Sequence, residues 1–219
     1  MKTDRLQNGA VWFYGPIFLI VFTATVYLSL VTEAAGLQES PARFKIRVKA
    51  KEVQRIYTSQ LGVREKASNS GPAVEQYLRY VNLPKGNPWC AAFVCWVLGK
   101  AGVDNPRTGW SPALFPAKRV IWERAKRELK PDSYREGDGT RGMAGPRMGD
   151  VFGIYFPEKG RIAHVGFVDE WDGTWVLTVE GNTNGEGEGS LASPGMTTDG
   201  VYRKRRLVRS VFRVARYVE

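Results

Sequence analysis

Histidine and cysteine are scarce in this sequence of 219 residues, which contains one histidine and two cysteines. So few ligands of these two types exclude a zinc finger or another His/Cys metal cluster. Glycine-rich phosphate-binding motifs, internal repeats and the usual nucleic-acid-binding signatures are also missing. The sequence therefore predicts no metal, no cofactor and no nucleic-acid partner.

The two cysteines, Cys90 and Cys95, lie in one continuous apolar segment. If that segment is a helix, their Cα atoms are about 8–9 Å apart, given a rise of about 1.5 Å and about 3.6 residues per turn. A disulfide needs a Cα separation below about 7 Å. We therefore predict two free thiols, which give no information on the redox compartment.

Charge of one sign predominates, with a net charge of +10. A domain this basic attracts polyanions, and an anionic cell-wall polymer or a membrane surface would qualify. The alternative is a basic surface without a specific partner. Hydrophobic residues make up 43% of the chain, so a globular domain with a sizeable core is expected.

Residues Ala10 to Val31 form an uncharged run of 22 residues, close to the roughly 20 that span a bilayer as a helix. Lys2 and Arg5 precede the run, which favours an N-terminus inside the cell. The apolar core of a cleaved signal is shorter, about 7–15 residues, so an anchor is favoured over a signal segment. Either interpretation places the remaining chain outside the cytoplasm. The predicted organisation is a cytoplasmic n-region (1–9), a transmembrane anchor or signal segment (10–31), a polar linker (32–42) and one folded domain (43–219).

The periodicity of apolar residues changes from helical to alternating at Asp150. Helices are predicted over 46–61 and 72–81, followed by a buried helix in which Asn87 is the N-cap and Pro88 the first residue. An exposed helix over 116–129 and a mobile loop over 130–149 are expected next. Strands are predicted over 150–156, 162–170, 174–180, 201–205 and 211–217. This order indicates an α+β fold in which N-terminal helices, preceded by the hydrophobic N-terminal helix, pack on a C-terminal antiparallel β-sheet.

Cys90 and His164 are the candidates for nucleophilic chemistry. Cys90 would be the third residue of the buried helix, where the positive end of the helix dipole favours a thiolate. The alternative is a small buried hydrophobe, the commonest role of a free cysteine, and this role suits Cys95. His164 is the only histidine, so it alone can be the base of a cysteine hydrolase, with a structural role as the alternative.

Glu180 ends the strand after the one that begins with His164, and a carboxylate there could hold the imidazole. A three-residue hairpin loop over 171–173 pairs Glu170 with Thr174 and puts His164 across from Glu180. A two-residue loop would put Glu180 on the opposite face. We predict the three-residue loop because it gathers the apolar residues of both strands on one face.

Three motifs, in this order, resemble the CHAP family of cysteine- and histidine-dependent amidohydrolases and peptidases. They are GNPWCAAFV at 86–94, HVGFV at 164–168 and VEGNTN at 179–184. The segments LGVRE (61–65), NSGP (69–72) and GWSP (109–112) are also similar to wall-lytic members of that family. The resemblance covers about residues 47–217.

The resemblance implies a papain-like fold and cleavage of peptidoglycan, as an amidase or an endopeptidase. It assigns Cys90 as nucleophile, His164 as base, and Glu180 or Asn182 as the group that orients the imidazole. The backbone N–H of Cys90 is a candidate oxyanion donor. A non-catalytic wall-binding module and an acyl transferase on the same fold are the alternatives.

Substrate-binding candidates are Trp89, Trp110 and Asn69, which lie in or beside these motifs. For the two tryptophans, core packing or an exposed rim is the alternative. The basic segment 203–206 is a candidate for binding wall polymer or lipid headgroups, or else a solvated strand end.

Overall fold

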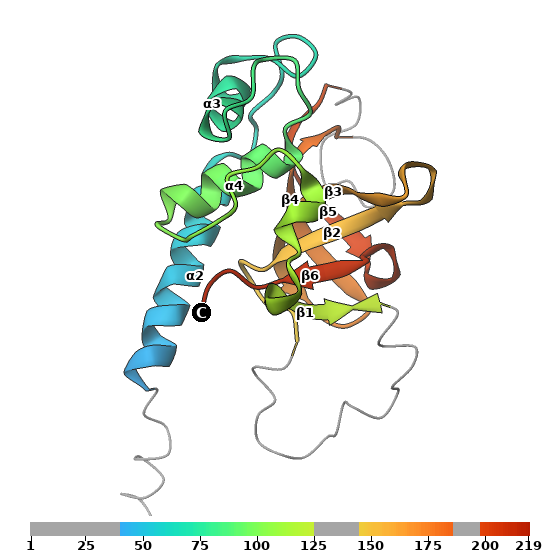
Figure 1. Ribbon diagram of the computed structural model, residues 1–219. Helices are drawn as coiled ribbons and strands as arrows, with labels where there is room; N and C mark the ends of the chain where they lie inside the picture. The colour runs from blue at the N-terminus through green and yellow to red at the C-terminus, as the bar shows by residue number, and fades with distance from the viewer. Residues whose placement is uncertain (1–39, 125–144, 186–197) are drawn as a thin grey trace, which may run out of the picture. The chain divides into compact units, whose positions relative to one another are not determined.

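A computed structural model describes residues 40–124, 145–185 and 198–219 (Figure 1). Lys45–Glu219 form a compact unit of their own. The predicted hydrophobic helix, residues 10–31, lies outside the described residues, as does most of the predicted loop 130–149. No helix in the described ranges combines the length and the apolar character needed to cross a bilayer.

In the described residues, three α-helices come before the main strands of the sheet: α2 (Pro41–Ser59), α3 (Pro72–Tyr80) and α4 (Cys90–Lys100). Helix α2 starts inside the predicted linker 32–42, because Ser40 Oγ accepts a hydrogen bond from the backbone N–H of Arg43 at 3.3 Å. This is the N-cap arrangement that serine favours, with proline in the first helical position. After α2 the chain turns at Gly62, whose φ of 91° suits glycine.

Within the part of the chain that the structure describes, six antiparallel strands form one sheet in the order β1-β6-β2-β3-β4-β5. The predicted strands correspond to β2–β6, so the α+β class is confirmed. Strand bounds are Val120–Glu123 (β1), Val151–Phe156 (β2), Arg161–Trp171 (β3), Trp175–Thr183 (β4), Gly200–Leu207 (β5) and Arg213–Ala215 (β6). Short 3-10 helices lie at Ser111–Leu114 (η1), Ala117–Arg119 (η2), Pro157–Lys159 (η4) and Val208–Ser210 (η5).

The prediction of an exposed helix over 116–129 is wrong in the part that the structure describes. Strand β1 lies there instead and pairs with β6, with Val120 opposite Ala215 and Trp122 opposite Val214. Trp122 is buried at 9% exposure. The partner strand lies far along the chain, so local spacing could not reveal this pairing, although valine and isoleucine favour strands.

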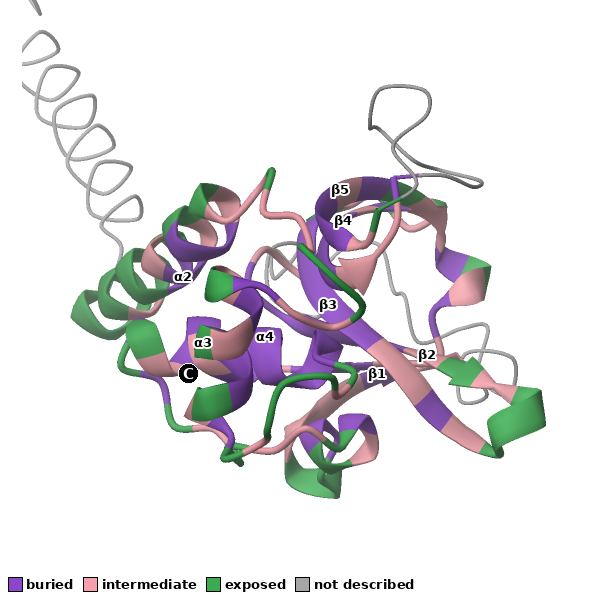
Figure 2. Cartoon of the chain, turned by 90° about the horizontal axis from the view of Figure 1, so that it is seen from above, coloured by how far each residue is buried: buried purple, intermediate pink, exposed green. Residues whose placement is uncertain are grey.

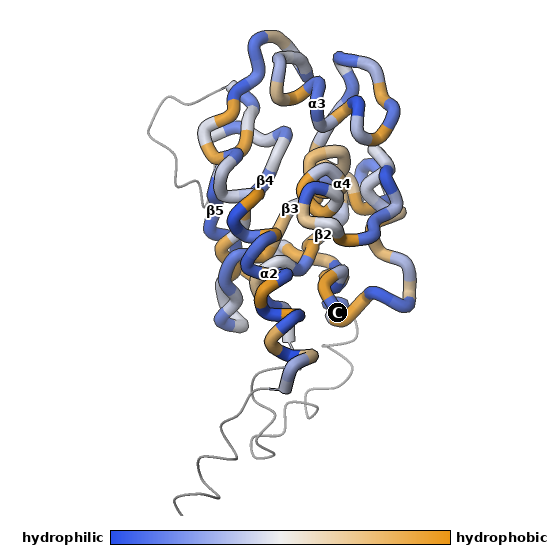
Figure 3. Tube along the Cα trace, turned by 90° about the vertical axis from the view of Figure 1, so that its left-hand side faces the viewer, coloured by the Kyte–Doolittle hydropathy of each residue, from blue (hydrophilic) through white to orange (hydrophobic). Residues whose placement is uncertain are grey.

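Both faces of the sheet are covered by apolar side chains. On one face α4 packs against β3 and β4, and α3 packs against α4 (Figure 1). Figure 2 shows α4 almost entirely buried, whereas α2 and α3 have exposed outer surfaces, and Figure 3 shows hydrophobic residues where α4 meets β3. The other face holds a smaller buried cluster, made by Trp122, Phe152, Val168, Val176, Val208, Val211 and Val214.

A chain of aromatic contacts fixes the helices on the sheet. Tyr77 of α3 meets Phe93 of α4 with ring centroids 5.4 Å apart, and Phe93 meets Phe167 of β3 at 6.1 Å. Tyr57 of α2 stacks on Phe167 at 5.0 Å. Each such pair adds about 0.5–1.5 kcal/mol beyond the burial of its area. These contacts hold α4, which begins with one of the cysteines, in a fixed place against β3.

The predicted pairing of the β3–β4 hairpin is wrong. Glu170 pairs with Leu177, not with Thr174, and Trp171 pairs with Val176, so the predicted loop over 171–173 does not form. A bulge then shifts the register by one residue between Val168 and Glu170. Before the bulge, Phe167 pairs with Val179. On this side of the bulge the register differs from the predicted one by two residues, so the side chains there stay on their predicted faces.

Asp169 is the residue at the bulge, and the contacts of its buried carboxylate explain why the bulge forms. It accepts hydrogen bonds from Tyr57 Oη at 2.6 Å and Gln54 Nε2 at 2.9 Å, both in α2. Arg203 of β5 pairs with it at 3.0 Å. These partners lie far away in sequence, so the spacing of apolar residues in β3 could not predict the extra residue.

Candidate active site

Cys90 is the first residue of α4, and its side chain is buried at 6% exposure. The positive end of the helix dipole lies at this end and favours a thiolate. The first residue of a helix also has a backbone N–H without an acceptor inside the helix. Cys90 therefore combines a thiol and a hydrogen-bond donor at one point.

The start of α4 differs from the prediction, because Trp89 and not Asn87 occupies the N-cap position. Asn182 compensates for the missing side-chain cap: its Oδ1 accepts a hydrogen bond from the Trp89 backbone N–H at 2.8 Å. Asn182 Nδ2 donates to Asn69 Oδ1 at 3.0 Å and to Glu65 Oε1 at 3.3 Å. Asn182 thus braces the helix that carries Cys90.

Two of the substrate-binding candidates take part in this bracing. Trp89 is fully buried, and its indole N–H donates to Glu65 Oε1 at 2.8 Å. Its side chain is a core element, which corrects its prediction as part of a substrate groove. Asn69 is held by Asn182 and also donates its backbone N–H to Glu65 Oε2 at 2.8 Å.

His164 lies on β3 with a side chain that is 12% exposed. Its Nε2 lies 2.8 Å from Glu180 Oε2. Cys90 Sγ lies 4.0 Å from the carbonyl oxygen of the adjacent Ala163, and Nδ1 is the ring nitrogen left for the thiol, which acts electrostatically on the imidazole. The sole histidine of the chain therefore bridges the thiol and a carboxylate.

The pKa of the Cys90 thiol is lowered, and the pKa of the His164 imidazole is raised. Burial raises the pKa of the Cys90 thiol, but the hydrogen bond and charge of His164 outweigh it, so the pKa falls below its ordinary value. Burial lowers the pKa of His164, yet Cys90 and Glu180 raise it to about 9. A thiol pKa that falls beside an imidazole pKa that rises favours a thiolate–imidazolium pair.

Glu180 of β4 is completely buried and ionised. Burial alone would raise its pKa, but Arg206 first and His164 second lower it strongly. Arg206 of β5 reaches both carboxylate oxygens, with Nε 2.6 Å from Oε1 and Nη2 2.7 Å from Oε2. Thr178 adds a hydrogen bond from its hydroxyl to Oε1. Glu180, and not Asn182, is therefore the group that contacts the imidazole.

Gly166 makes room for the Glu180 side chain. A Cβ atom at Gly166 would lie 2.8 Å from Val179 O, 2.8 Å from Phe152 Cε1 and 3.0 Å from Glu180 Cγ. These distances are too short for real contacts, and one of the three atoms belongs to the backbone. Glycine is therefore needed at position 166, next to the Glu180 side chain whose carboxylate contacts His164.

We expect Gly166→Ala to lower the free energy of unfolding by about 1–3 kcal/mol, as overpacking of a buried site does. Urea denaturation followed by tryptophan fluorescence measures this loss. Gly145→Ala is the matched control, because a Cβ there meets nothing within 4 Å. Equal denaturation midpoints for Gly166→Ala and the unaltered chain would contradict the steric explanation.

Ser111 is a site residue that was not singled out from the sequence. It is buried at the start of η1, and its Oγ lies 3.7 Å from Cys90 Sγ. The adjacent Trp110 is 53% exposed, with the Arg161 guanidinium 4.2 Å from its ring centre. The GWSP motif at 109–112 was the available signal, since it resembles a family segment. Trp110 is the substrate-binding candidate whose side chain remains accessible.

Cys95 has the features of a structural thiol. It is fully buried inside α4, and its Sγ lies 3.5 Å from the Thr108 carbonyl oxygen. Burial raises the pKa of its thiol to about 11. Both cysteines are free, as predicted, but their environments shift the two pKa values in opposite directions.

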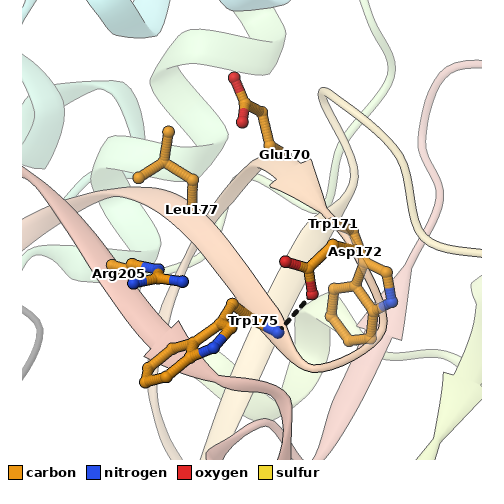
Figure 4. A pocket seen from close by; sticks show the side chains of 6 residues that line it. All are labelled: Glu170, Trp171, Asp172, Trp175, Leu177 and Arg205. Atoms are coloured by element: carbon orange, nitrogen blue, oxygen red, sulfur yellow. Dashed lines mark hydrogen bonds between the residues drawn. The ribbon is translucent and has the colours of Figure 1, made fainter.

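A hollow of about 220 Å³ lies at the hairpin end of β3 and β4 (Figure 4), lined by Glu170, Trp171, Asp172, Trp175, Leu177 and Arg205. The Asp172 carboxylate accepts hydrogen bonds from the backbone N–H groups of Thr174 and Trp175. Along β3, Trp171 is about 23 Å from His164 at about 3.3 Å per residue. The hollow is therefore separate from the Cys90 site.

Acidic residues, cysteines and histidine do not gather into a metal-binding group of three or more anywhere in the described ranges. The charged side chains around Glu180 are instead paired with arginine and imidazole.

A thiol at the start of a buried helix, an imidazole on the adjacent strand and a buried carboxylate on the next strand define a class of site. In this class the imidazole acts as base for the thiol, and the carboxylate orients and stabilises the imidazolium. The arrangement can attack a carbonyl carbon and form a thioester.

The model of the CHAP domain matches residues 82–182 of the chain. The family indicated by the sequence motifs is therefore confirmed, and the matched segment holds Cys90, His164, Glu180 and Asn182. CHAP domains are in general cysteine- and histidine-dependent amidohydrolases or peptidases. No curated protein and no solved structure matches the chain.

Proposed function

We propose that this protein hydrolyses an amide bond of peptidoglycan through a thioester on Cys90. The observation that carries the proposal is the buried series of contacts from Cys90 to His164 to Glu180. Peptidoglycan is the substrate class because the CHAP domain suggests this type of hydrolysis at the level of the family. The papain-like arrangement expected from the sequence is supported by α4 packing on the antiparallel sheet.

Acylation begins with transfer of the Cys90 proton to His164 Nδ1. The thiolate attacks the amide carbonyl carbon, and the negative charge moves to the carbonyl oxygen. The Cys90 backbone N–H and the Ser111 hydroxyl are the donors near that oxygen. The imidazolium then gives its proton to the amine, the C–N bond breaks, and a thioester remains on the sulfur.

Deacylation uses the same imidazole. His164 takes a proton from water, the hydroxide attacks the thioester carbonyl, and the carboxylic acid leaves while the thiol regains its proton. Glu180 stays ionised throughout and stabilises each imidazolium that forms. An amine in place of water would make the protein an acyl transferase, which is the alternative reaction on the same site.

Binding of the wall is proposed to use Trp110 beside the thiol and the positive charge of the protein. Trp110 is exposed and carries Arg161 against its ring. The net charge of +10 would attract anionic wall polymer or a membrane surface, and salt would weaken this attraction.

We also propose that the domain acts outside the cytoplasm. The support is the uncharged run Ala10–Val31 preceded by Lys2 and Arg5, which favours export of the chain that follows it. Labelling intact cells with a membrane-impermeant amine reagent tests this. Lysines of the domain should react in intact cells, and protection until lysis would contradict the proposal.

Digestion of purified peptidoglycan by the full chain, with identification of the products by mass spectrometry, tests the function. An amidase separates peptides from the glycan strand, whereas an endopeptidase cuts within the peptides. Exchanged or newly cross-linked peptides would indicate a transferase. Binding to the wall without any product would contradict catalysis and support a non-catalytic wall-binding module.

A further inference from the structure

We propose that Arg206 is a positioning residue that completes the site, holding the Glu180 carboxylate against His164 so that Cys90, His164, Glu180 and Arg206 act as one unit. The proposal rests on the proposed function in taking Cys90 as the nucleophile. Arg206 lies on β5, outside the matched segment 82–182, so the family match does not include it.

The position of Arg206 in the sheet supports this role. On β5, Arg206 pairs with Val176, whereas Tyr202 is the residue that pairs with Glu180. The Arg206 side chain therefore extends along the sheet to reach Glu180, where it makes two hydrogen bonds of 2.6 and 2.7 Å. A guanidinium that holds both carboxylate oxygens fixes their plane, which one contact could not do. The Oε2 atom held by Arg206 is also the atom that contacts His164.

The positive charge of Arg206 also supports this role. Glu180 is fully buried, and Arg206 and His164 are 19% and 12% exposed. When the site is active it holds a thiolate, an imidazolium and a carboxylate, which together carry one negative charge. The positive charge of Arg206 brings the net charge of these buried groups to zero. A net charge in such a place is costly, so the site without Arg206 should take up a proton more readily.

Neighbouring charges do not replace Arg206. The other titratable groups that act electrostatically on Glu180 or His164 are Lys204, Asp199 and Cys90. Burial is the largest influence on both Lys204 and Asp199, and it lowers the pKa of the lysine and raises that of the aspartate. Among the described residues, Arg206 is the one that holds the Glu180 carboxylate with two hydrogen bonds.

The test is the rate at which iodoacetamide alkylates Cys90 in the full chain, measured against pH, with mass spectrometry separating Cys90 from Cys95. Loss of the positive charge in Arg206→Met should raise the pKa of every group in the cluster. The acid limb of the alkylation profile is therefore expected to move up by about one pH unit or more. Arg206→Lys keeps the charge and loses the two-point contact, so its acid limb should stay near that of the unaltered chain.

Arg203→Met is the matched control, because Arg203 lies on the same strand and pairs with another buried carboxylate, Asp169, at 3.0 Å. It should lose stability without any shift of the alkylation profile. An unshifted profile in folded Arg206→Met, or an equal shift in Arg203→Met, overturns the proposal. If Arg206→Met does not fold, Arg206→Lys decides. We expect it to hydrolyse peptidoglycan at least about tenfold more slowly with thiol pKa unchanged, and an unaltered rate overturns the proposal.

Alkylation of Cys90 needs no peptidoglycan. The proposed function and the proposed role of Arg206 can therefore be contradicted independently of each other. A chain that leaves peptidoglycan intact but shows the Arg206 shift loses the proposed function and keeps the positioning role of Arg206. A chain that cleaves peptidoglycan with unshifted profiles keeps the function and loses that role.

Discussion

Cys90→Ala is expected to abolish the release of soluble products from purified peptidoglycan, with a fall in rate of at least about 10³-fold. The Cys90 sulfur is the atom that forms the thioester, and neither Ser111 nor His164 can replace it. The side chain is small and lies at the end of α4, so the variant should still fold. Product release measured by chromatography gives the rate, and circular dichroism checks the fold.

Cys95→Ala is the matched control, since it removes the same group five residues further along the same helix. Cys95 is buried, and its Sγ contacts the Thr108 carbonyl oxygen. Its replacement should leave the rate within about twofold. Product release by Cys90→Ala at more than a tenth of the normal rate would contradict a cysteine mechanism.

Glu180→Gln is expected to lower the rate by about 10²–10⁴-fold, the range seen when the orienting carboxylate of a catalytic triad is neutralised. The amide cannot offset the imidazolium charge, and it leaves Arg206 buried without its partner. Loss of the negative charge should also lower the pKa of His164 from about 9. The alkaline limb of the pH–rate profile should therefore move to lower pH.

Asp169→Asn separates this effect from loss of stability. Asp169 is another buried carboxylate paired with arginine, and it lies on β3 away from the imidazole. Its replacement should destabilise the fold and leave the pH–rate profile in place. If Glu180→Gln keeps more than half of the normal rate while folded, the carboxylate has no part in the reaction.

Much of the fold followed from local sequence, because its elements carry local signals. Strands β2 to β6 and helix α3 have clear periodicity, and the uniformly apolar α4 was recognisable as a buried helix. Strand β1 was missed because pairing with β6 decides its structure. The bulge at Asp169 was missed because its cause is a set of partners in α2 and β5.

For the site, the sequence was sufficient to name Cys90, His164 and Glu180, whose residue types have few alternative chemical roles. It did not separate Glu180 from Asn182 as the group at the imidazole, since both follow the same strand. In the folded chain Asn182 holds the start of α4 instead. Arg206 is one of many basic residues in the chain, and only its place beside Glu180 distinguishes it.

The proposed mechanism requires that His164 make Cys90 a thiolate at a pH where an ordinary cysteine is protonated. The direct measurement is the alkylation rate of Cys90 against pH in the unaltered chain and in His164→Asn. The unaltered chain should react at pH values well below the ordinary thiol pKa, because His164 lowers the pKa of Cys90. In His164→Asn, the largest influence that opposes burial is lost, so the profile should move to higher pH. Identical profiles for the two proteins would contradict the thiolate–imidazolium pair and the mechanism that depends on it.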